Sequence, residues 1–90
     1  MPPAILTPAD LVAFARHLSK AADSVARRRR KATRLIAESR NVWKDAKYDR
    51  FRKTFDQTAK DLDKFVRLAD DYSQFLERKA ALARKFLDRG

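Results

Sequence analysis

The feature that most constrains the fold is a long series of apolar residues spaced alternately three and four positions apart, interrupted once near the middle of the chain. This spacing places side chains on one stripe of an α-helix. The first stretch continues to about residue 40, with Arg28 as its one charged member, and its apolar members are Leu11, Phe14, Leu18, Ala21, Val25, Ala32 and Leu35.

The second stretch has the same spacing and consists of Tyr48, Phe51, Phe55, Thr58, Leu62, Phe65, Ala69, Tyr72, Leu76, Lys79, Ala83 and Phe86. One Gly and three Pro in 90 residues are too few for the turns that a sheet requires. The sequence therefore predicts an all-α fold, an antiparallel two-helix hairpin forming a single domain over residues 1–90. Its helices are expected at 8–40 and 45–89, with a turn at 41–45.

Residues at the helix ends support these boundaries. Thr7 is a good N-cap, Pro8 suits the first helical position, and the Asp10 carboxylate can reach back to the cap. Asn41 is expected to end the first helix in a left-handed conformation, and Asp45 to cap the second.

Apolar residues also lie beside each stripe, which predicts that the hairpin pairs with a second one. They are Val12, Ala22 and Ile36 in the first helix and Ala59, Val66, Phe75, Ala80 and Leu87 in the second. Two helices alone would leave part of this wider surface in water, whereas a four-helix bundle covers it. The partner is expected to be an identical or related hairpin, and the second helix should extend beyond the first. The predicted interface residues are Leu11, Phe14, Leu18, Val25, Leu35, Phe55, Leu62, Phe65, Tyr72, Leu76 and Phe86.

The net charge of +10 favours an anionic partner, and the cations are most concentrated in the first helix. The basic cluster comprises Arg27, Arg28, Arg29, Arg30, Lys31 and Arg34. One interpretation is a set of solvated helix faces, in which Arg28 pairs across the hairpin with Asp56, Asp61 or Asp63. A second is a nucleic-acid-binding surface. A membrane surface is disfavoured, because the aromatic residues follow the helix stripes.

No pattern of residues indicates an enzyme. The chain has no Cys, its one His is His17, and its one Gly is Gly90, so no metal, cofactor, phosphate-loop or small-molecule site is predicted. The chain lacks both an apolar run of about 18 residues and the order of a signal peptide. The expected location is therefore cytoplasmic, or secreted without a cleaved signal peptide.

Trp43 is the only tryptophan and lies in the predicted turn, with Phe51 eight positions later. A turn tryptophan followed at this spacing by an aromatic residue, in a helical hairpin of about this length, resembles the WXG family of type VII secretion substrates. Asp45 stands where that family has glycine, giving W-x-D in place of W-x-G. The family's tyrosine followed four residues later by an acid is also missing at Tyr72, where Leu76 follows.

The resemblance implies a small non-enzymatic protein that dimerises through its helices and acts as a secretion substrate, or as the partner or chaperone of one. The residues implied for the turn motif are Trp43, Asp45 and Phe51. A basic nucleic-acid-binding hairpin is the alternative function.

Overall fold

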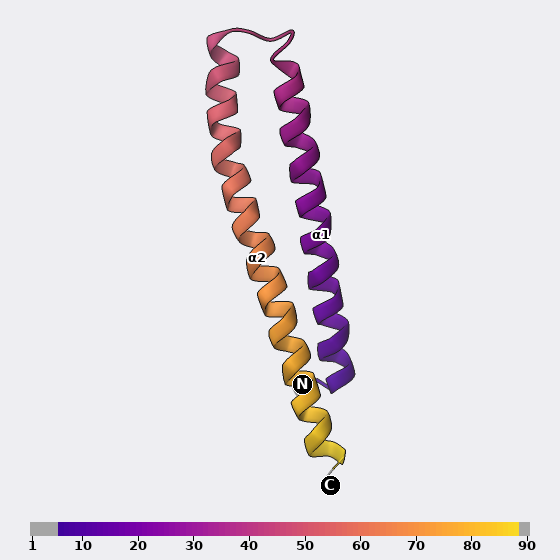
Figure 1. Cartoon of the computed structure of the whole chain (residues 1–90). Helices are drawn as coiled ribbons and strands as arrows, with labels where there is room; N and C mark the ends of the chain where they lie inside the picture. Colours follow the sequence, from indigo (N-terminus) through magenta and orange to yellow (C-terminus); the bar gives the residue numbers. More distant parts are fainter. Residues whose placement is uncertain (1–5, 89–90) are drawn as a thin grey trace, which may run out of the picture.

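The protein is a hairpin of two long antiparallel helices, α1 and α2, as the computed structural model of residues 6–88 shows (Figure 1). Helix α1 covers Pro8–Ser39 and α2 covers Ala46–Asp88. The rod measures 68 × 27 × 14 Å, so it is a single layer of two helices. The predicted all-α hairpin is confirmed for the described residues.

Helix α1 begins at a capping box, as the sequence predicts. The Asp10 amide donates to Thr7 Oγ1 at 3.1 Å, and the Thr7 amide donates to Asp10 Oδ2 at 2.9 Å. These reciprocal bonds satisfy two backbone donors that a helix start otherwise leaves free. The bond from the Thr7 backbone, together with the contact to its side chain, lowers the pKa of Asp10.

The turn differs from the expectation at Asn41. Within residues 6–88 no residue has a positive φ, so the predicted left-handed terminator is wrong. Helix α1 instead ends at Ser39 with Arg40 in a right-handed conformation, and the Trp43 amide donates to the Ser39 carbonyl at 2.8 Å. The Asp45 carboxylate accepts from the Tyr48 amide at 3.0 Å, which caps α2. The expected end of the second helix at residue 89 lies outside the described residues.

The helices meet along one row of buried or half-buried residues on each helix, and we call these two rows the inner seam. Its members again alternate three and four positions apart. From α1 they are Val12, Ala15, Ser19, Ala22, Ala26, Arg29, Thr33 and Ile36, and from α2 they are Tyr48, Arg52, Phe55, Ala59, Leu62, Val66, Ala69, Ser73, Leu76, Ala80 and Ala83.

This seam corrects the expected hairpin contact. In α1 every member lies one position after the predicted series, and in α2 every second member does. The physical reason is residue size. Ala15 and Ala22 are fully buried and Ala80 is 1% exposed, so small side chains let the two backbones approach closely. Larger members of the seam, such as Tyr48 and Leu76, lie on α2 and are 3% and 6% exposed.

Helix α2 extends past the start of α1, as expected (Figure 1). Phe86 and Leu87 in this extension are 75% and 68% exposed. Lys79, Leu82, Ala83 and Phe86 line a shallow hollow on it. This end of α2 therefore offers apolar surface that α1 does not cover.

Candidate helix-pairing surface

Apolar side chains gather on one side of the hairpin, which we call the apolar face. Its members lie one position before members of the inner seam, except Phe86, which lies beyond the last of them. Helix α1 contributes Leu11, Phe14, Leu18, Ala21, Val25, Ala32 and Leu35, and α2 contributes Phe51, Phe65, Leu68, Tyr72, Phe75, Leu82 and Phe86.

Helix geometry places both sets on the same side. One residue corresponds to about 100° of rotation at 3.6 residues per turn. A step of one position back from the seam therefore turns each helix by the same angle, and in the same sense relative to its own chain direction. In an antiparallel pair these two steps lead to the same side of the hairpin. The apolar face is thus a single surface two helices wide.

Much of this face is exposed to solvent and is not used in the packing of α1 against α2. Phe14 and Leu35 are each 51% exposed, and Tyr72 is 52% exposed. The Tyr72 and Phe75 rings stack with centroids 5.7 Å apart, and the Lys79 ammonium lies 5.8 Å from the Phe75 ring centre. An exposed apolar patch of this kind makes the face a candidate interaction site.

Trp43 closes the turn end of the apolar face through two aromatic contacts. Its ring centroid lies 5.3 Å from that of Tyr48, in an edge-on arrangement, and 5.9 Å from that of Phe51. The Arg40 guanidinium lies 5.1 Å from the Tyr48 ring centre. The structure thus brings together Trp43 and Phe51 of the predicted turn motif, while Asp45 caps α2 beside them.

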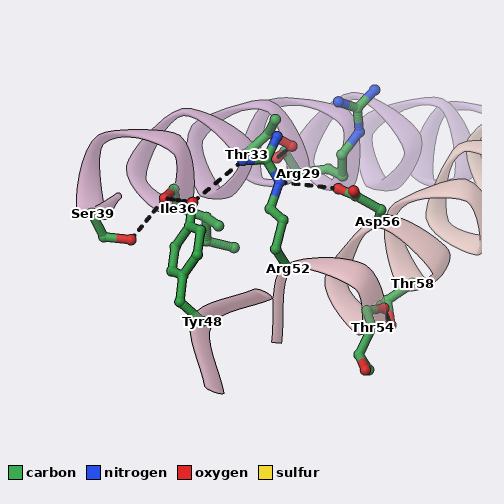
Figure 2. A network of polar contacts seen from close by, with 9 residues as sticks. All are labelled: Arg29, Thr33, Ile36, Ser39, Tyr48, Arg52, Thr54, Asp56 and Thr58. Atoms are coloured by element: carbon green, nitrogen blue, oxygen red, sulfur yellow. Dashed lines mark hydrogen bonds and ion pairs between the residues drawn. The ribbon is translucent and has the colours of Figure 1, made fainter. Parts of the chain in front are cut away.

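Tyr48 ties this cluster to α1, as Figure 2 shows. Its hydroxyl donates to the Ile36 carbonyl at 2.8 Å and accepts from Arg52 at 3.3 Å. Arg52 also contacts the Asp56 carboxylate at 3.4 Å, and the bonds to Tyr48 and then Asp56 raise the pKa of Arg52. The turn end is therefore held by side-chain bonds as well as by ring packing.

Two polar contacts fix the register of the inner seam away from the turn. Arg29 binds both carboxylate oxygens of Asp63, at 2.9 and 3.2 Å. The buried Ser73 hydroxyl donates to the Ala15 carbonyl at 2.8 Å. The expected pairing of Arg28 is corrected here, since Arg29 occupies the seam and binds Asp63, whereas Arg28 is exposed beside the apolar face.

The opposite side of the hairpin carries charge. Its members lie one position after members of the inner seam. Helix α1 places there Arg16, Lys20, Asp23, Arg27, Arg30 and Arg34, and α2 places there Asp49, Lys53, Asp56, Lys60, Asp63, Arg67, Asp70 and Glu77. Three of its acids are already paired with cations outside this set, Asp63 with Arg29, Asp49 with Arg40 and Asp56 with Arg52. We call this surface the charged face.

The described part of the chain shows neither a metal site nor a membrane-spanning helix. Residues 6–88 hold no group of three or more His, Cys, Asp or Glu side chains placed to bind a metal ion. No helix in this range combines the length and apolarity needed to cross a bilayer. His17 is exposed on α1.

The sequence reasoning missed the row of small residues that forms the inner seam, and with it the bond between Ser73 and Ala15. A signal was present. Ala15, Ser19, Ala22 and Ala26 also repeat at steps of three and four, and Ala59, Ala69, Ser73 and Ala80 lie ten, four and seven positions apart, which keeps them on the same stripe. Small residues at seam spacing indicate close helix packing as much as large ones do.

The fold is that of a two-helix hairpin with large apolar side chains exposed on one face. Residues 5–85 match the WXG100 family, described as proteins of 100 residues with WXG, and the chain belongs to that family. No curated protein and no solved structure matches the chain.

Proposed function

We propose that this protein is a non-enzymatic module that buries its apolar face against a second helical hairpin, giving a four-helix bundle. The observation that carries this proposal is the division of side chains by size. The most buried positions of α1 are the small residues Ala15 and Ala22, while Phe65, Tyr72 and Phe75 remain 45%, 52% and 44% exposed on one face. Burying apolar area is worth about 25 cal/mol per Å².

Both helices contribute to this face, and two such faces packed together would form a core of normal thickness. Trp43 and Phe51 would close that core at the turn end, next to the packed rings already present. The second hairpin is either a second copy or a related chain. The surface needs only an apolar counterpart of similar length and width.

Replacing Phe65 with aspartate tests the pairing surface. The change places a charge in the centre of the apolar face, and we expect association of Phe65→Asp to weaken at least tenfold, since a buried unpaired carboxylate is costly. The association is measured by sedimentation. The tagged protein is purified from its own cells together with any hairpin that binds to it.

The matched control is Gln74→Asp, which makes the same change in charge on the charged face. This variant is expected to assemble like the wild type. Assembly of Phe65→Asp at wild-type strength, or equal loss in both variants, would show that the apolar face is not the pairing surface.

Membership of the WXG100 family supports a role in type VII secretion, and we propose that the protein leaves the cell as part of its four-helix complex. Tagged wild type and Gln74→Asp are expected in the culture medium when the type VII ATPase is intact and to be absent from it when the ATPase is deleted. Phe65→Asp is expected to stay inside, because it cannot form the complex. Immunoblots of medium and cells measure this, and release of all three proteins independent of the ATPase would contradict the proposal.

A further inference from the structure

Four cations on the outward side of α1 form a stripe that the pairing function does not use. Arg27, Arg30, Lys31 and Arg34 are spaced at i, i+3, i+4 and i+7, so they lie on one side of the helix. All four are exposed. At 1.5 Å per residue they span about 10 Å along the axis.

The acids that the sequence offered as partners for Arg28 are not paired with the stripe cations either. Asp63 binds Arg29 in the inner seam, and Asp56 binds Arg52 on its own helix. Asp61 lies one position before the seam residue Leu62, which puts it on the opposite side of the hairpin. None of the ion pairs within residues 6–88 involves a stripe cation.

The charge of the hairpin is also concentrated around this stripe. Residues 27–63 hold more than half of the Lys and Arg of the chain but only half of its Asp and Glu. Three of the four stripe residues are arginines, whose planar groups donate pairs of hydrogen bonds to phosphate oxygens. The stripe points away from the apolar face, so a second hairpin packed on that face would leave it free.

From this arrangement we propose that the stripe Arg27, Arg30, Lys31 and Arg34 binds the phosphate backbone of nucleic acid. A row of cations at near-regular spacing matches a polymer with regularly spaced negative charge better than it matches the irregular acids of a protein surface. The aromatic side chains lie at the turn and on the apolar face, away from the stripe. The proposed binding therefore involves no stacking on bases. We expect the binding to be independent of the nucleotide sequence.

The experiment is a salt titration of binding to a fluorescent 20-base-pair DNA duplex of arbitrary sequence. The affinity should persist in the micromolar range at about 150 mM salt. Because each neutralised phosphate contributes about −0.9 to the slope of log K against log salt, four contacts give a slope of about −3.6. A single strand of the same length should bind no more tightly than the duplex, because the stripe offers no ring for stacking.

Two variants with the same total charge separate the stripe from the general basicity of the chain. The stripe variant replaces Arg27, Arg30, Lys31 and Arg34 with glutamine. The control replaces the exposed Lys64, Arg78, Arg84 and Lys85 of α2 with glutamine. The stripe variant should bind at least tenfold more weakly with a slope reduced by about 3, whereas the control should lose less than threefold. Circular dichroism of both variants establishes that they remain helical.

Equal losses in the two variants would overturn the proposal, since only net charge would then matter. So would wild-type binding that disappears at 150 mM salt. Vesicles containing phosphatidylserine and an acidic protein such as α-lactalbumin serve as competitors. Stripe-dependent binding to either of them that exceeds binding to the duplex would also overturn it.

Discussion

Replacing Ala22 with leucine is expected to lower the free energy of unfolding by about 1–3 kcal/mol, the usual cost of overpacking a close contact. Ala22 is 0% exposed in the inner seam, where α1 and α2 approach closely. A leucine there must push the helices apart, which also strains the neighbouring bond between Ser73 and Ala15. Thermal unfolding at equal protomer concentration should show the midpoint falling by several degrees.

The neighbouring residue provides the control. Ala21 is exposed on the apolar face, one position before the seam. At protein concentrations too low for the hairpin to pair, Ala21→Leu should leave the free energy of unfolding within about 0.5 kcal/mol of the wild type, as for a surface substitution. If Ala21→Leu destabilised the protein and Ala22→Leu did not, the seam would be the series expected from the sequence, and the assignment of the two faces would be reversed.

Removing the indole of Trp43 is expected to destabilise the turn end of the hairpin. Trp43→Ala loses the ring contacts to Tyr48 and Phe51. Truncating a buried aromatic residue costs about 3–5 kcal/mol, and Trp43 is half-buried, so we expect about 2 kcal/mol. Assembly with a second hairpin should weaken as well, because Trp43 closes the turn end of the apolar face.

The control variants are the single alanine substitutions from Arg27 to Lys31. Trp43→Ala should weaken assembly more than any of these, as measured by sedimentation at equal concentration. Arg29→Ala is the most demanding comparison, because it leaves Asp63 without its partner in the seam. Effects of equal size, or larger for any of the cations, would mean that charge and not aromatic packing governs association.

The sequence predicted the helices and their start because the information is local. Alternation of three and four positions requires a helix, and Thr7 with Asp10 makes the capping box within one turn. The approximate place of the turn followed from the break in that spacing. The conformation at Asn41 was mispredicted, because residue preference at a helix end yields to the backbone bonds that the chain can make there, such as that from Trp43 to Ser39.

The choice between Arg28 and Arg29 shows the limit of such reasoning. The two are adjacent in a run of cations, so composition and spacing treat them alike. Only the packed hairpin turns Arg29 toward Asp63, which is 34 positions away in the chain. A rotation of 100° about the helix axis separates the two outcomes, and a single helix has no means of selecting it.

By itself, the sequence determined that this protein is a helical hairpin with two adjacent apolar stripes on each helix, since both follow from periodicity along the chain. Only the tertiary structure decided which stripe faces inward. The stripe that holds Ala15, Ala22, Ser73 and Ala80 allows the backbones to approach closely, so it forms the seam, and most of the large aromatic and aliphatic residues lie on the other stripe. The large ones are left on the surface, where a second hairpin can reach them.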